Sequence, residues 1–536
     1  MALDNIKPGK SIALLFRLSL ILAALAFCGY EIWIYSGRSP WIDEISSLIN
    51  YPLAQVSDIF APLPYAQQAA PASFNLLSTA THGLSVQEMR ILFSLIILVV
   101  IAISVGLAYR FKTAACVGAA AFILSSPIFF HYATELKFYG FEMAGAAVVA
   151  AWLIRYDASR PMRLIDLGVL IFAVSLGIST MVIALCATLA VLYLRMTGTD
   201  RPKRREILVF LGFGLFCVAY YFQVRYSVSY QIESFPDSYN TSGPKAVFDL
   251  NYALIRGHRM IGSLTVAIVF AILLYYSRTN AESRRFLSFS LAVYVAFCFL
   301  AAIGKYPASE ARHIAWSVGV FAMAAGLAGG LVLKRGLDFN DRIAASILIC
   351  AMIGNFSYAA PKLFSLDKNY TDNDGLADWL ESAAPSRIVL YYGAPRLKMF
   401  MEQSGAEIDK HQFFGMVNLS SGRADPYYFS QSYLTQDYDV IAKDLLSQLS
   451  EPVASDRMER IFRILENFRG YADYALDFAP SQVPVVLIAT HVNWDPDPGH
   501  EDPRYLDLID ALSDRGCEHS MEFSGKQAFA MRVVCP

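Results

Sequence analysis

Hydrophobic residues in the first two thirds of the chain gather in runs long enough to cross a membrane. A hydrocarbon core needs about 20 apolar residues per helix. On that measure the 536-residue chain offers about eleven candidate spans: 12–35, 90–109, 113–130, 139–154, 164–177, 180–195, 207–224, 260–277, 286–303, 314–333 and 343–359. Residues 164–195 read as two spans, because Gly177-Ile178-Ser179-Thr180 predicts a tight reversal, and one long tilted helix is the alternative. The pattern predicts a polytopic α-helical membrane protein with about eleven transmembrane helices.

Composition agrees with this class, since 55% of the residues are hydrophobic and 17% charged. Cations set the predicted orientation. With the N-terminus inside, the inner segments carry 18 Lys or Arg residues, whereas the much longer outer loops carry nine. The first apolar run follows Lys7 and Lys10 and lacks a small-residue cleavage site, so it is typical of an anchor rather than a signal peptide. We therefore expect a membrane domain over residues 1–360, with a long first outer loop at 36–90.

Charged and turn-forming residues return after about residue 361, so residues 361–536 are expected to form a soluble domain on the outer side. Buried-strand runs at 387–392 and 483–489 alternate with helical periodicity at 441–449, 456–468 and 504–514, and 521–534 reads as a terminal hairpin. This alternation predicts a small α/β domain. Cys517 and Cys535 are the cysteines of this domain, and an oxidising compartment favours a disulfide between them over two separate buried thiols. A polar loop with His491, Trp494, Asp495, Asp497 and His500 is more typical of a solvated surface than of a metal site.

An acidic pair just past the first span is the first candidate for chemistry. It lies in Ser39-Pro40-Trp41-Ile42-Asp43-Glu44. On a helix, adjacent residues point about 100° apart, so Asp43 and Glu44 are expected to take different roles. A carboxylate in a cavity can accept a proton from a hydroxyl nucleophile. The alternative is structural, because acids also favour the first turn of a helix.

Two further charged clusters are predicted on the same side of the membrane. Thr134-Glu135-Leu136-Lys137-Phe138-Tyr139 follows the third span, and if it is helical Glu135 and Tyr139 share a face. An aromatic belt with a lysine anchor is the alternative there. Arg312-His313 precedes the tenth span, against the charge bias, and an arginine fork suits phosphate oxygens. A salt bridge to Glu310 or to a loop carboxylate is the alternative.

These three clusters, in this order, resemble the C-type membrane glycosyltransferases, in particular the protein O-mannosyltransferase and lipid A aminoarabinose transferase group. The resemblance rests on Trp41-Ile42-Asp43-Glu44, the stretch Gln67-Gln68-Ala69-Ala70-Pro71, the Glu135–Tyr139 segment, and Tyr306-Pro307 with Arg312-His313. Where the family segment has an arginine, this chain has Lys137, which keeps the charge but loses the bidentate fork.

The resemblance implies an inverting glycosyltransferase that moves a sugar from a polyprenyl-phosphate donor to an acceptor hydroxyl on the extracytoplasmic face. It implies that Asp43 is the base and that Glu44 supports or positions the acceptor, with Arg312 and His313 on the carrier phosphate. The remaining substrate-binding candidates are Glu135, Lys137, Tyr139, Gln68, Arg256, His258 and Arg259. No cofactor is certain, and a divalent metal stays open because its use varies among these enzymes.

Two other functions remain as alternatives. A ligase of a whole glycan or a lipid-phosphate group would need the same phosphate clamp. A transporter or flippase of a lipid-linked sugar usually shows internal repeats and broken mid-membrane helices, neither of which is evident in the sequence. The expected partners are the lipid-linked donor, a glycan, glycolipid or protein acceptor, and the bilayer, with no nucleic acid. The expected location is a bacterial inner membrane, with a cytoplasmic N-terminus and a periplasmic C-terminal domain.

Overall fold

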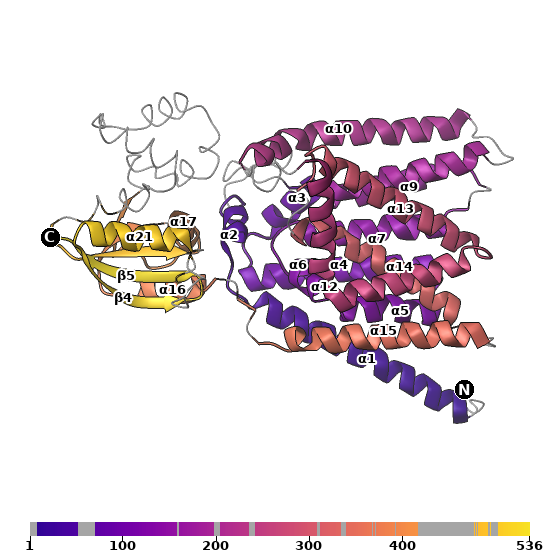
Figure 1. Cartoon of the computed structure of the whole chain (residues 1–536), viewed down its shortest axis with the longest axis horizontal. Coiled ribbons are helices and arrows are strands. Elements are labelled where there is room, and N and C mark those ends of the chain that lie inside the picture. The colour runs from indigo at the N-terminus through magenta and orange to yellow at the C-terminus, as the bar shows by residue number, and fades with distance from the viewer. Residues whose placement is uncertain are drawn as a thin grey trace.

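The computed structural model describes residues 8–51, 70–157, 160–197, 204–234, 242–307, 311–333, 339–366, 368–369, 371–391, 393–415, 476, 479, 481–490, 492, 494 and 502–536. These residues form a bundle of apolar helices and, at one end of it, a small α/β domain (Figure 1). The chain is a polytopic membrane protein with a C-terminal soluble domain, as the sequence predicts.

Each apolar run predicted as a span coincides with a helix, and the run 113–130 coincides with a bent pair of helices. The helices of the bundle are α1 (Pro8–Ser36), α4 (Val86–Tyr109), α5 (Thr113–Leu124) with α6 (Pro127–Ala133), α7 (Tyr139–Arg155), α8 (Leu164–Ser175), α9 (Ile178–Thr197), α10 (Arg204–Ser234), α12 (Gly243–Tyr276), α13 (Ala281–Ala302), α14 (Trp316–Val332) and α15 (Phe339–Leu363). Among the described residues, six helices are long and apolar enough to cross a membrane, or seven if the α5–α6 pair, bent by 75°, is one span. Because α7, with 17 residues, and the described apolar parts of α1, α8 and α9 are shorter, eleven crossings stay a prediction.

The reversal expected near Gly177 is confirmed, and the single long helix is wrong. Helix α8 ends at Ser175 and α9 begins at Ile178. A buried carboxylate fixes the break, since Glu142 of α7 accepts a hydrogen bond from the backbone N–H of Ser179 at 2.7 Å. This interaction satisfies one of the backbone donors that a helix N-terminus leaves without an intrahelical partner.

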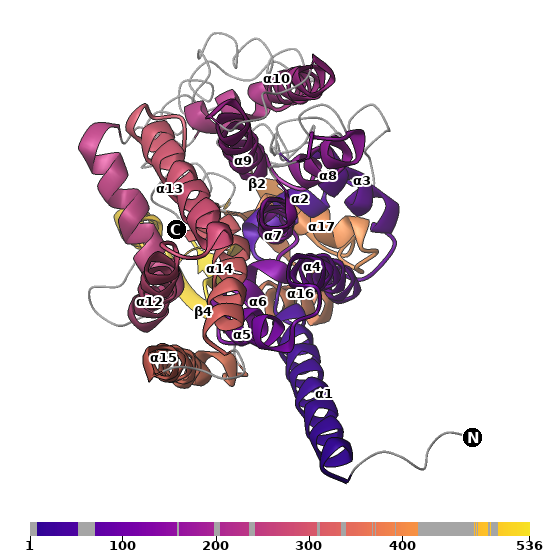
Figure 2. The same cartoon turned by 90° about the vertical axis from the view of Figure 1, so that its right-hand side faces the viewer.

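Small residues let the central helices approach closely. Helix α14 is almost entirely buried and packs against α5 and α7, as the end view in Figure 2 shows. A Cβ atom on Gly118 of α5 would lie 2.6 Å from the backbone oxygen of Ala325 in α14. Only glycine permits that separation, so the sequence of α5 sets how near the two helices lie.

Ion pairs link neighbouring segments of the chain at the end of the bundle away from the soluble domain, where α1 begins (Figure 1). Arg195 of α9 pairs with Glu206 of α10 at 3.1 Å, and Arg160 pairs with Asp166 of α8 at 3.1 Å. Both arginines lie in segments predicted to be inner. The side of the membrane that this end faces stays a prediction.

The soluble domain is built on a five-stranded sheet in the order β2-β1-β3-β5-β4. Its strands are β1 (Arg387–Leu390), β2 (Gln412–Gly415), β3 (Val485–Thr490), β4 (Glu518–Gly525) and β5 (Ala528–Val534). Strands β1, β2 and β3 are parallel, whereas β5 runs antiparallel to β3 and β4. The terminal hairpin predicted at 521–534 is therefore confirmed as β4 and β5. The Cys517–Cys535 disulfide closes its open end, which is the pairing expected from the sequence.

Alternate residues of each strand face two different apolar layers. On one face, Val389 and Leu487 pack with the helix α21 (Pro503–Asp514). On the other face, Ile388 and Ile488 pack with the helices α16 (Asn373–Ser382) and α17 (Ala394–Gln403). Both faces are covered, as parallel strands require. The helices expected at 441–449 and 456–468 lie outside the described residues, as do most residues of the polar loop that contains His491 and His500.

Candidate functional site

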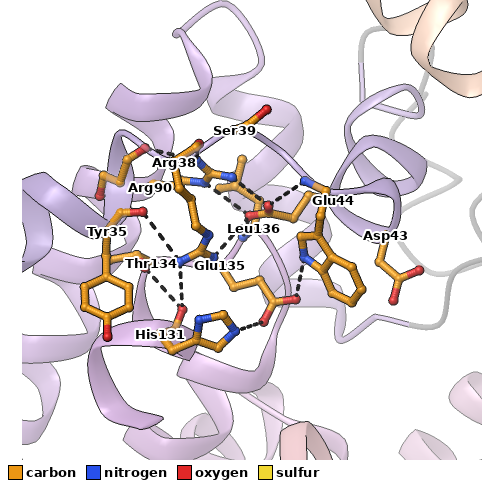
Figure 3. Close-up of polar contacts among 12 residues, drawn as sticks. Tyr35, Arg38, Ser39, Asp43, Glu44, Arg90, His131, Thr134, Glu135 and Leu136 are labelled. Atoms are coloured by element: carbon orange, nitrogen blue, oxygen red, sulfur yellow. Dashed lines mark hydrogen bonds and ion pairs between the residues drawn. The ribbon is translucent and has the colours of Figure 1, made fainter. Parts of the chain in front are cut away.

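The acidic pair lies on a two-turn helix, α2 (Ile42–Leu48), between the bundle and the soluble domain (Figure 1). Pro40 and Trp41 lead into this helix, and Trp41 is its N-cap residue. Asp43 and Glu44 occupy the first turn, where the helix dipole favours acids. Their side chains point in different directions, as Figure 3 shows and as the spacing of adjacent helical residues requires.

Glu44 is buried in a network of arginines. One of its oxygens lies 2.6 Å from Nη2 of Arg90, and the other accepts a hydrogen bond from Nε of the same arginine at 3.2 Å. Arg38 approaches to 3.7 Å, and the backbone N–H of Leu136 donates at 2.8 Å. Burial alone would raise the pKa of Glu44, but the two guanidinium groups and these hydrogen bonds outweigh it and hold the pKa below its usual value.

This network links three segments through Glu44 and its partner Arg90: α2, the end of α1 and the start of α4. Its carboxylate also accepts a hydrogen bond from the backbone N–H of Trp41 at 3.3 Å, which caps α2. Arg90, near the start of α4, donates in addition to the carbonyl oxygen of Ser36 at the end of α1. The geometry therefore matches the structural alternative left open by the sequence, in which an acid stabilises the first turn of a helix.

Asp43 faces the opposite way and meets the third cluster. Its Oδ2 atom lies 2.7 Å from Nη1 of Arg312, which belongs to the short 3-10 helix η2 (Ala311–Ile314). The two side chains are 29% and 25% exposed, so this ion pair, unlike that of Glu44, is open to solvent. The guanidinium of Arg312 also lies over the ring of Trp41, 6.0 Å from its centre. Asp43 is thus the loop carboxylate that the sequence offered as an alternative partner of Arg312, while Glu310 lies outside the described residues.

Glu135 and Lys137, from the second cluster, interact electrostatically with the same charged side chains. Glu135 is buried, accepts a hydrogen bond from Nε1 of Trp41 at 3.1 Å, and approaches His131 to 4.0 Å. Burial, with a smaller contribution from the Glu44 carboxylate, raises the pKa of Glu135 to about 7. Burial also lowers the pKa of the Lys137 amine, against the opposing effect of Asp43 and Glu135. Residues 134–137 are not helical, so the shared helical face considered for Glu135 and Tyr139 does not form.

Tyr139 and His313 meet across the bundle. Their rings pack edge to face with centres 5.6 Å apart. The hydroxyl of Tyr306 donates to the backbone oxygen of His313 and accepts from Nε1 of Trp316 at 2.9 Å. These aromatic contacts fix the short helix that carries Arg312.

The basic residues of α12 predicted to bind substrate do not share one set of contacts. His258 is buried and lies 2.7 Å from the hydroxyl of Ser317 in α14. Arg259 takes a left-handed backbone with φ of 62° at a kink in α12, and its guanidinium lies over the ring of Tyr358 in α15. Arg256 is exposed. Gln68 lies outside the described residues.

Two important residues, Arg38 and Arg90, are absent from the candidates predicted by the sequence. A signal for them existed, because both belong to the nine cations of the outer loops, which oppose the charge bias in the same way as Arg312. Among the described residues, no three His, Cys, Asp or Glu side chains are arranged to hold a metal ion.

The fold is similar to that of a protein of known structure. No protein-family model and no curated protein matches the sequence. The structure matches that of ArnT from Cupriavidus metallidurans bound to undecaprenyl phosphate, with 12% sequence identity, a TM-score of 0.52, and coverage of 96% of this chain and 98% of ArnT. The apo structure of the same ArnT matches with 12% identity, a TM-score of 0.50, and coverage of 97% and 98%. Over almost its whole length, the chain therefore has the fold of ArnT, a lipid A aminoarabinose transferase of the C-type glycosyltransferase class.

Proposed function

We propose that the chain is an inverting glycosyltransferase that moves a sugar from a polyprenyl-phosphate donor to an acceptor hydroxyl of a glycan, glycolipid or protein. The observation that carries the proposal is the open Asp43–Arg312 pair, which places a carboxylate beside a guanidinium at 2.7 Å, next to Lys137. A base and a phosphate clamp side by side are what this reaction needs. The likeness to ArnT supports a polyprenyl phosphate as the sugar carrier, since that protein was crystallised with undecaprenyl phosphate.

In the proposed reaction Asp43 accepts the proton of the acceptor hydroxyl. The acceptor oxygen then attacks the anomeric carbon of the sugar, and the bond from that carbon to the carrier phosphate breaks on the opposite side, which inverts the configuration. The phosphate leaves with the bonding electron pair and gains negative charge. Arg312 and Lys137 stabilise that charge, which is the type of electrostatic assistance that contributes most in such transfers.

The pairing of Asp43 with Arg312 couples donor binding to the state of the base. A phosphate that binds Arg312 competes with Asp43 for the same guanidinium. Donor binding would therefore release the carboxylate at the moment when the base is needed. Because the reaction inverts the anomeric carbon, the released Asp43 would act on the face of the sugar opposite the carrier phosphate, where the acceptor oxygen arrives.

Glu44 supports this site by holding α2, and His313 supports it by holding η2 through the Tyr139 and Tyr306 contacts. We place the reaction at the end of the bundle next to the soluble domain. With the orientation predicted by the cation distribution, this is the periplasmic face of a bacterial inner membrane.

The test is binding of undecaprenyl phosphate to the purified full-length protein, measured by native mass spectrometry. We expect the parent protein to bind and Arg312→Ala to lose most of the binding. Lys305→Ala is the matched control, because Lys305 is an exposed cation of the same loop. Absence of binding in the parent, or equal loss in both variants, would refute the proposal.

A further inference from the structure

The helix that carries Asp43 belongs as much to the soluble domain as to the membrane domain. Ile45 and Ile49 are completely buried, and they belong to the same apolar core as Leu380 of α16 and Ile488 of β3. Helix α17 of the soluble domain packs directly on α2. The α16–α17 face of the sheet is therefore completed by a segment from the first outer loop.

Hydrogen bonds fix the entry to α2 from the soluble side. The side-chain amide of Asn373 donates to the carbonyl oxygen of Pro40 at 2.6 Å. Ser39 accepts from the backbone N–H of Asp374 at 2.9 Å and donates its own N–H to Asn369 at 2.8 Å. Thr490 of β3 in turn donates to the amide oxygen of Asn373, so the sheet itself orients the contact with Pro40.

A second set of hydrogen bonds fixes the end of α2. Arg396 of α17 donates to the hydroxyl of Ser46 at 2.8 Å. Gln403, at the other end of α17, donates to the carbonyl oxygen of Ile49 at 3.1 Å. Both bonds are in part buried, where loss of a polar partner costs more than at the surface.

A seven-residue helix needs such support. Isolated helices shorter than about 12 residues are marginal in water, so α2 owes its order to its neighbours. Glu44 secures one side of it to the bundle, while Ile45 and Ile49 secure another side to the soluble domain. Asp43 lies between the two attachments, and its direction toward Arg312 depends on both.

We propose that the soluble domain positions the base of the active site, with Asn373, Arg396 and Gln403 as positioning residues that hold Asp43 against Arg312. This inference rests on the proposed function, in which Asp43 and the carrier phosphate compete for Arg312. The soluble domain would then set how firmly Asp43 occupies Arg312 and where the carboxylate stands once it is released.

The test uses full-length protein carrying Arg396→Ala with Gln403→Ala, and separately Asn373→Ala. Lys398→Ala is the matched control, because Lys398 is on the same helix and contacts Glu402 and Phe413 within the soluble domain. Two quantities are measured: hydrogen–deuterium exchange of residues 42–51, and affinity for undecaprenyl phosphate. We expect faster exchange and a carrier affinity that rises by up to about fivefold, the most that an open ion pair of this kind contributes. Combined with Asp43→Asn, these changes should give the affinity of Asp43→Asn alone and no more, and Lys398→Ala should change neither quantity.

A merely structural contact would increase exchange but would not tighten carrier binding. Unchanged or weaker affinity in the loosened variants, while the parent binds, would overturn the inference and leave the proposed function standing. If the parent itself does not bind, the proposed function fails, and unchanged exchange in α2 would separately overturn the positioning role. Should the double variant not fold, Gln403→Ala alone removes a single hydrogen bond and is judged by the same two measurements.

Discussion

Replacing Asp43 by asparagine should strengthen binding of the lipid carrier. The substitution keeps the size of the side chain and removes its charge, so Arg312 loses its ionic partner at 2.7 Å. In the parent protein an arriving phosphate must first displace that partner. In the variant it does not, so the free energy of the Asp43–Arg312 pair should appear as extra affinity for phosphate.

The exposure of the pair sets the magnitude. Both side chains are between a quarter and a third exposed, so solvent screens their attraction. Ion pairs of this kind contribute about 0.2–1 kcal/mol, which corresponds to an affinity gain of about 1.4- to 5-fold. Because salt screens exposed charges, the gain should be larger at low ionic strength.

A double-mutant cycle isolates the effect. Undecaprenyl phosphate is titrated against the parent protein, Asp43→Asn, Arg312→Ala and the double variant. Asp43→Asn should tighten binding in the parent background and have no effect when Arg312 is already alanine. Sugar transfer, once the donor is known, should be lost in Asp43→Asn despite the tighter binding.

Weaker binding by Asp43→Asn would mean that the carboxylate helps to hold the carrier, directly or through a bound cation. An equal gain with and without Arg312 would mean that Asp43 repels phosphate from a distance. Either result would refute competition for one guanidinium.

Three further changes have defined outcomes. Glu44→Gln should lower the free energy of unfolding by about 3–5 kcal/mol in a denaturation experiment, because it leaves Arg90 buried without a counter-charge, whereas replacing both residues with apolar ones should recover part of that loss. Since the pKa of Glu135 is raised to about 7, the stability it contributes is complete below pH 4.5 and declines as the pH rises to 7, and Glu135→Gln should flatten that decline in melting temperature. Cys517→Ser should destabilise the soluble domain by about 3 kcal/mol, because Cys535 closes a short loop with it, and reduction of the parent should give the same shift in melting temperature.

The sequence predicts the helices well because membrane helices have a strong local signal. Each apolar run is helical in the structure, with the run 113–130 divided into α5 and α6, and Gly177 correctly marks the break between α8 and α9. The partner that fixes this break, Glu142, could not be predicted, and the sequence offered Arg312 an unspecified loop carboxylate without identifying Asp43. Arg312 is 269 residues from Asp43 in the chain, and nothing local in either segment specifies that distant contact.

The acidic pair is a second case in which the local sequence does not specify the contacts. The spacing predicts that Asp43 and Glu44 point apart, but it does not say which of them is buried. Three attachments decide this: Glu44 to Arg90, and Ile45 and Ile49 to the core of the soluble domain. A rotation of α2 that brought Asp43 to Arg90 would turn both isoleucines out of that core. The apolar face of α2 therefore selects the residue that stays open to solvent. That residue, Asp43, keeps the access that a base requires because its neighbour pairs with the buried Arg90.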